Sequence, residues 1–409
     1  MPAAHVAPRP VPFPALRSRP FVLFWSGLVI SHTGTWMQSV GQGWLVYQLT
    51  NTPVWLGLTN LAFALPMVIL PLIGGAVADR FHRIKLIRAI QLFMAVVSGI
   101  TAVLTYTGTI QAWQLAAFSL IQGIVLAFEG PARHATVPEL VDRGSLLSAL
   151  SLVASSYQLG GFFGPALAGV LLGVLGNDRI YVLFALNAVS FLVYAVNLSL
   201  ILGVSHAREE SATLLGSLAD GARFVWGQPT LRTLLTLATI VGVFGRSYVA
   251  LMPVFARDVL RTDARGLGFL SAAPGVGVII GATVLSTTGA SGAKGRMIVG
   301  SSLVFATMLS AFTLSRVMPA SLALLVVLGM ATITLSAAIN TTMQLAAPGP
   351  LRGRVMSLSA IANVGLPSVG AMLTASAAAV VGAPVAVAAG AGLVAAAAVV
   401  LGRRVLKID

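Results

Sequence analysis

The sequence predicts an all-α membrane protein in which twelve transmembrane helices form two six-helix bundles that are copies of one fold. Three observations lead to this prediction. The composition is 57% hydrophobic and only 9% charged, against about 25% charged residues in a soluble domain. Apolar runs long enough to cross a bilayer recur along the whole chain, and one sequence motif is repeated half a chain later.

The apolar runs are separated by charged residues or by Gly and Pro, and each is long enough for a helix of about 20 residues. They begin near Phe21, Trp55, Ile84, Trp113, Ser145, Tyr181, Leu231, Leu267, Met297, Ser321, Arg354 and Pro384. The last two runs lie in a nearly uniform Ala/Val/Gly tract, broken only at 382–384. We therefore expect a first bundle at 21–204 and a second at 231–402, with short tails at 1–20 and 403–409.

The basic residues fix the expected orientation. Summed over alternate loops, 19 Lys and Arg lie on the side of the two termini, whereas five (Arg179, Arg257, Arg261, Arg265 and Arg316) lie on the other side. Because basic loops stay in the cytosol, both termini are predicted to be cytosolic. The net charge of +14 is spread over helix ends without interleaved aromatics, so we expect no nucleic-acid partner. The chain has no cysteine, which excludes disulfides.

The longest connection, 205–230, divides the spans six and six. Leu215, Leu218, Ala222 and Val225 recur in it at helical spacing, which predicts a short amphipathic helix at the cytosolic interface. On either side, "DRGSLLSALSLVASSYQLGG" and "LRGRVMSLSAIANVGLPSVG" align at one constant offset of 209 residues. This offset is typical of parallel six-helix repeats, which enclose a substrate path between them.

The turn after the second run, "GGAVADRFHRIKLIR", resembles the loop signature of the major facilitator superfamily through Gly75, Asp79, Arg80 and Arg83. His82 and Ile84 depart from that signature. The fifth run carries "GGFFGPALAG", in which Gly160, Gly164, Pro165 and Gly169 resemble the Gly-Pro motif of exporters in this superfamily. Small residues at this spacing also allow ordinary close packing between helices.

Longer stretches such as "EGPARHATVPELV" look like the branch of the superfamily that contains the bacterial enterobactin exporter and related drug or macrolide efflux proteins. The resemblance implies a monomeric secondary active transporter in the bacterial inner (plasma) membrane. It would export small amphipathic, drug-like or siderophore-like molecules by alternating access, and proton-driven antiport is expected by analogy. A lysophospholipid transporter of the same fold and a non-transporting scaffold or receptor remain alternatives.

The resemblance also implies a cytosolic latch. Asp79 would cap the eleventh span near Met356 and Ser357, and Glu129 would be the acid for Arg80 or Arg83. The alternative is that these basic residues only hold the loop in the cytosol.

Polar residues inside spans are the candidates for a substrate cavity. Ser31, Thr35, Gln38 and Gln42 form one stripe on the first span, with His32 beside it. Arg246 lies deep in the seventh span, facing either the cavity, where it would favour an anionic or acceptor-rich substrate, or the outer interface. Weaker candidates are Gln122, Gln158, Asn340 and Asn363. Each of these polar residues, Arg246 apart, could instead tie helices together.

An enzyme is not expected. Intramembrane catalysis needs a metal site, an Asp pair, or Ser and His within reach of each other. The mid-span candidates Ser31 and His32 are adjacent in sequence, so they point about 100° apart on a helix. We expect no catalytic residue, no metal and no cofactor.

Overall fold

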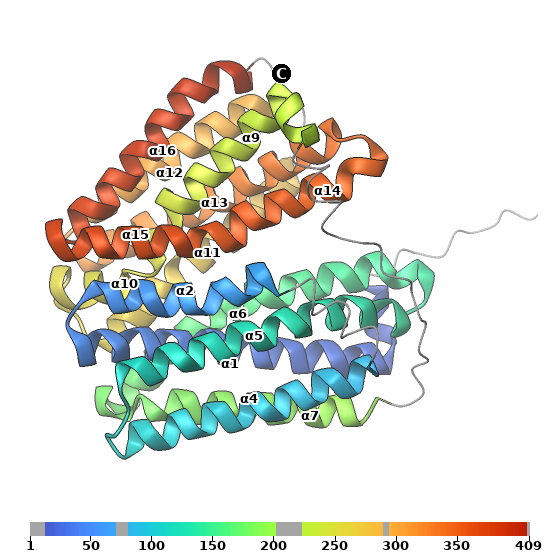
Figure 1. Cartoon of the computed structure of the whole chain (residues 1–409), viewed down its shortest axis with the longest axis vertical. Coiled ribbons are helices and arrows are strands. Elements are labelled where there is room, and N and C mark those ends of the chain that lie inside the picture. Colours follow the sequence, from blue (N-terminus) through green and yellow to red (C-terminus); the bar gives the residue numbers. More distant parts are fainter. Residues whose placement is uncertain (1–12, 71–80, 202–222, 289–293, 407–409) are drawn as a thin grey trace, which may run out of the picture.

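The computed structural model describes residues 13–70, 81–201, 223–288 and 294–406, and every regular element in them is helical (Figure 1). The long helices of the first half are α1 (Arg19–Thr50), α2 (Pro53–Ile69), α4 (Arg83–Tyr106), α5 (Ala112–Thr136), α6 (Leu146–Leu175) and α7 (Tyr181–Ser199). Those of the second half are α9 (Pro229–Ile240), α11 (Ala264–Thr288), α12 (Lys294–Leu314), α13 (Met318–Ala346), α14 (Gly349–Ala360), α15 (Leu366–Val381) and α16 (Ala383–Val405).

Ten helical stretches of the described residues are long and apolar enough to cross a membrane. The helix α2 has 17 described residues and is a shorter apolar helix. The helix α1 has 32 residues but is not among the ten, and it carries the polar stripe predicted above. A multi-pass membrane protein is thus confirmed, while the count of twelve spans stays a prediction.

Local sequence sets where these helices begin and end. Ser18 caps α1, because its side chain accepts a hydrogen bond from the backbone N–H of Phe21. Proline occupies the first turn of α2, α9 and α16, where its missing N–H costs nothing. Gly176 and Gly382 follow α6 and α15 with positive φ angles of 95° and 84°, a conformation that favours glycine. The break expected at 382–384 is therefore real.

The helices of the first half lie together in the lower part of Figure 1, and those of the second half lie in the upper part. Contacts between the two groups run mainly through α6 with α11 and through α2 with α15. The two halves pair in the same way, as the repeat motifs predict. The helix α6 packs on α1 of its own group and on α11 of the other group. The helix α15 packs on the turns that follow α9 in its own group and on α2 of the other group. We call the end with Arg19 and Arg404 the basic end, and the end with Gly176 and Gly382 the opposite end.

The seventh span begins where expected but is not one regular helix. After α9 the chain continues as a π-helical turn η5 (Val241–Gly245), a 3-10 turn η6 (Arg246–Val249), α10 (Met252–Val254) and a second π-helical turn η7 (Phe255–Val259). A third π-helical turn, η8 (Ile361–Gly365), lies between α14 and α15. Turns of this kind often mark functional sites, because they displace side chains and loosen the hydrogen-bond ladder.

The connection between the halves is described only in part. Residues 223–227 are helical, and Val225 is buried in the core. Three of the four positions that predicted an amphipathic helix, Leu215, Leu218 and Ala222, lie outside the described residues.

Candidate functional site

The C-terminal part of the polar stripe on α1, Gln38 and Gln42, ties helices together. The Gln38 side-chain oxygen accepts hydrogen bonds from Ser98 of α4 at 2.5 Å and from Asn187 of α7 at 2.7 Å. Gln42 donates to the Ser119 hydroxyl of α5 at 2.6 Å. These bonds correspond to the helix-tying alternative, although they do not test a role in a cavity. Thr35 is half-buried on the same helix.

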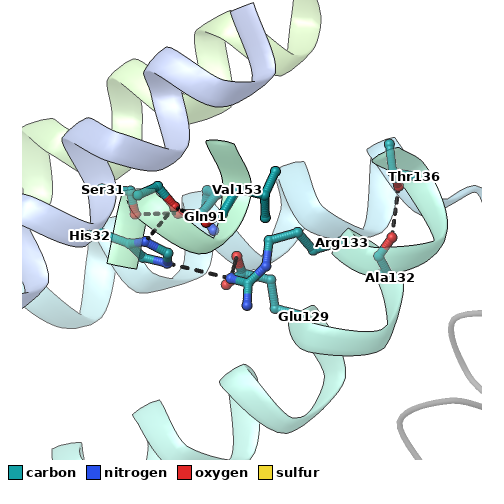
Figure 2. A network of polar contacts seen from close by, with 9 residues as sticks. Ser31, His32, Gln91, Glu129, Ala132, Arg133, Thr136 and Val153 are labelled. Carbon is teal, nitrogen blue, oxygen red and sulfur yellow. Dashed lines mark hydrogen bonds and ion pairs between the residues drawn. The ribbon is translucent and has the colours of Figure 1, made fainter. Parts of the chain in front are cut away.

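The N-terminal residue of the stripe, Ser31, belongs to a buried polar cluster. We define this cluster as Ser31, His32, Gln91, Glu129, Arg133 and Ser156 (Figure 2). The His32 ring nitrogens lie 3.4 Å from Arg133 and 3.2 Å from the Ser156 hydroxyl. Arg133 forms an ion pair with Glu129 at 3.5 Å. Glu129 also accepts a hydrogen bond from Gln91, whose oxygen lies 3.4 Å from Ser31. Four helices, α1, α4, α5 and α6, therefore meet at this cluster.

The position of Glu129 corrects the sequence prediction in two ways. Glu129 is 7% exposed and lies about two turns before the end of α5, rather than at the helix end. Its cationic partner among the described residues is Arg133 and not Arg83, while Arg80, the other predicted partner, lies outside them. Arg83 instead pairs with Glu139 at 2.5 Å and donates to the carbonyl of Ala135.

The other members of the predicted latch, Gly75, Asp79 and Arg80, lie outside the described residues. The latch therefore stays a prediction. Glu139 is the acid that the structure places beside Arg83.

The Gly-Pro motif of α6 makes backbone contacts on two sides. A Cβ atom at Gly160 or Gly164 would lie 2.9 Å or less from backbone or side-chain atoms of α1. On the other side, Gly268 of α11 fits against Gly169, where an added Cβ would lie 2.4 Å from its Cα, and against Pro165. The motif thus joins α6 to its own half through one stripe and to the second half through the other.

The opposite end carries a polar contact between the halves. The Tyr47 hydroxyl of α1 donates a hydrogen bond to the Asp258 carboxylate of η7. The Arg257 guanidinium lies 5.4 Å from the centre of the Tyr47 ring and donates to the Tyr47 carbonyl at 3.4 Å. This contact holds the end of α1 against the second half.

Arg246 is half-buried among helices of its own half. Its guanidinium donates to the Asn363 carbonyl at 3.2 Å. It lines a narrow cavity of about 10 Å³, which is space for roughly one water. The lining residues are Ala238, Val241, Arg246, Thr332, Leu335, Ser336, Ile339 and Asn363. Asn340 and Asn363 both bond to Ser359, so this polar group connects α13, α14 and η8. The geometry favours the cavity-facing alternative for Arg246.

Tyr157 of α6 packs beside the buried polar cluster, and the sequence did not reveal it as a candidate. Its ring packs edge-on against His32 at 5.7 Å and Trp36 at 5.4 Å, yet the residue is 52% exposed. An isolated aromatic residue in an apolar helix gives no sequence signal of this kind. The remaining candidates, Gln122 and Gln158, are half-buried and exposed respectively.

Comparison with known sequences gives consistent relatives. The model of a protein family described as "Transmembrane secretion effector" matches residues 11–409. The staphyloferrin A transporter of Staphylococcus aureus is 27% identical over 64% of this chain and 66% of its own length. The multidrug efflux pump Tap of Mycolicibacterium fortuitum is 23% identical over 83% of this chain and 84% of its own length. The enterobactin exporter EntS of Escherichia coli is 27% identical over 80% of this chain and 78% of its own length.

Solved structures share the fold. A bacterial homologue of the human lysosomal transporter Spinster, in an inward-facing and unoccupied conformation, superimposes with a TM-score of 0.76 at 14% identity. The match covers 96% of this chain and 98% of the homologue.

Proposed function

The chain belongs to the transmembrane secretion effector family of the major facilitator superfamily, and we propose that it exports small amphipathic molecules by alternating access. Transport of small molecules across a bilayer follows from the family. The direction, the coupling ion and the substrate class are our proposal. The two halves would be six-helix bundles that rock about the substrate path.

The observation that carries the proposal is the location of the contacts between the halves. The close contacts between α6 and α11 extend from Gly161 with Gly275 to Gly173 with Arg265. These residues lie in the part of each helix that is nearer the opposite end. Tyr47 and Asp258 add a contact at that end itself. Contacts concentrated in this way support a state closed at the opposite end and accessible from the basic end.

The substrate class rests on the relatives and on the polar groups between the halves. Two relatives are named as a staphyloferrin A transporter and an enterobactin exporter, and one as a multidrug efflux pump. Arg246, Tyr157 and His32 could contact a substrate that carries polar groups on an apolar body. Glu129 and His32 are titratable groups inside the first half, which supports proton-driven antiport as the coupling.

Efflux in a host that lacks its own pumps tests this function. Cells that express the protein should accumulate severalfold less of at least one compound from a panel of fluorescent dyes and siderophores. Collapsing the pH gradient should restore accumulation, whereas collapsing only the membrane potential should have a smaller effect. Equal accumulation of every compound, in cells with verified membrane-inserted protein, would contradict export.

The proposed orientation places the basic end, and with it both termini, in the cytosol. A single cysteine can test it, because the chain has none of its own. Leu147 and Val174 lie at the two ends of α6 and are each 79% exposed. A membrane-impermeant maleimide added to intact cells should label Val174→Cys and should label Leu147→Cys only after the cells are opened. Labelling of Leu147→Cys in intact cells would reverse the topology.

A further inference from the structure

Arg133 of the first half and Arg246 of the second half differ in their charge balance. Arg133 of the first half is paired with Glu129. Arg246 of the second half donates to a neutral carbonyl, and the cavity that it lines contains no Asp or Glu. Among the described residues, the ion pairs are those of Arg83 with Glu139 and Arg133 with Glu129. A cation held inside a membrane protein without a counterion is costly, which is a reason to expect that another molecule supplies the negative charge.

Tyr157 locates the space in which such a molecule would lie. Tyr157 lies on one stripe of α6 with Gly161, Pro165 and Gly169, the stripe through which α6 contacts α11 of the second half. The exposed side of Tyr157 therefore lies on the face of α6 that is turned toward the second half. The Nε atom of Arg133 is buried without a hydrogen-bond partner among the described residues. This N–H group can therefore donate a hydrogen bond to a bound molecule.

The surroundings of this space are aromatic as well as cationic. Tyr157, Trp36 and His32 form a group of rings in edge-to-face contact. Flat aromatic surfaces favour an aromatic or otherwise apolar body, while a cation favours a carboxylate or phosphate. The two requirements together describe one chemical class.

Resting on the proposed function, we infer that the substrate site binds an anionic group on an aromatic or apolar body, with Arg246 as its main cation and Tyr157 as its aromatic contact. Arg133, already neutralised by Glu129, is the secondary cation on the first half. The anionic group can come from a free aromatic acid or from the headgroup of a single-chain lipid. The chemistry at Arg246 is the same in both cases.

Binding to the purified protein in lipid nanodiscs tests this inference without requiring transport. The probes are 2-naphthoate, the neutral 2-naphthamide and the cationic 2-naphthylmethylammonium, which share one ring system, and affinity is measured by titration calorimetry. A charge-assisted hydrogen bond in a partly buried site should make naphthoate bind about tenfold or more tightly than the amide. Oleoyl-lysophosphatidate and oleoyl-lysophosphatidylcholine form the matching lipid pair.

Variants separate the contribution of charge from that of the ring. Arg246→Gln should remove the preference for the anion, and Arg246→Lys should restore part of it. Arg232→Gln makes the same charge change on the exposed face of α9 and should leave the preference intact. Tyr157→Ala should weaken the three naphthyl probes alike. If Arg246→Gln does not fold, the comparison of Arg246→Lys with the wild type still measures the dependence on the guanidinium.

The binding measurements distinguish the two sources of the anionic group, and they also test whether the site exists. Binding of naphthoate that depends on Arg246 assigns a free acid, and binding of lysophosphatidate alone with the same dependence assigns a lipid headgroup. The inference is wrong if neither anion binds more tightly than its uncharged or zwitterionic partner, or if the preference persists in Arg246→Gln. Efflux of neutral compounds without any anion preference would leave the proposed function standing and remove only this inference.

Discussion

Replacing Gly164 by valine is expected to destabilise the protein by about 3 kcal/mol or more, at the upper end of the cost of overpacking. A Cβ at this position would lie 2.6 Å from the Thr33 carbonyl oxygen and 2.8 Å from the Met37 backbone nitrogen. Because these atoms belong to the backbone of α1, no side-chain rotation can relieve the clash. The helices α1 and α6 would have to move apart, which would break the hydrogen bond between His32 and Ser156.

The measurement is thermal unfolding in detergent, followed by the loss of the monodisperse peak in size-exclusion chromatography. Gly300→Val in α12 is the matched control, because a Cβ there meets no atom within 4 Å. We expect a midpoint lowered by several degrees, or loss of folded protein, in Gly164→Val only. Equal midpoints in the two variants would show that α1 and α6 do not pack as closely as described.

Replacing Glu129 by glutamine should destabilise the protein by roughly 3–5 kcal/mol, the usual cost of removing one partner from a buried ion pair. The substitution preserves the shape of the side chain and leaves the Arg133 cation without its carboxylate. Arg133 already has one buried nitrogen without a partner, so it has little means of compensation. Asp178→Asn, which removes the same charge from an exposed position, should have little effect.

A double variant shows whether the pair is the cause. Glu129→Gln with Arg133→Gln removes both charges, and it should recover much of the stability that the single variant loses. Thermal unfolding of the four proteins in the cycle measures this coupling. If the double variant is less stable than Glu129→Gln by the full cost of Arg133→Gln, the two residues do not interact.

Much of the helical framework could be predicted from the sequence. Apolar runs, and the charged, Gly and Pro residues that separate them, are local properties of a sequence. The helix expected near Trp113 begins at Ala112, and the one expected near Tyr181 begins at Tyr181. The superfamily resemblance is confirmed by the family match over residues 11–409. The twelve-span count, the two-bundle arrangement and the roles of the site residues stay predictions.

The buried polar cluster was missed for an identifiable reason. The segment "FEGPARH" has a proline and three ionisable residues, a composition that usually ends a helix. The structure continues α5 through Pro131 to Thr136, so Glu129 and Arg133 lie inside the fold instead of in a loop. Their partners come from other helices, and no local pattern predicts which helices will meet. The same holds for Tyr157, whose ring contacts His32 and Trp36 more than 120 residues away in sequence.

The polar stripe of α1 has a consequence for how the protein is synthesised. The helix α1 is made first, yet its buried polar side chains bond to Ser98, Ser119, Ser156 and Asn187, which follow it by 60 to 149 residues. Until those residues emerge from the ribosome, α1 would have to hold unpaired amide and imidazole groups in hydrocarbon. We therefore expect α1 to remain at the translocon or at the membrane surface until α4 to α7 have been made, so that the first half inserts as a group.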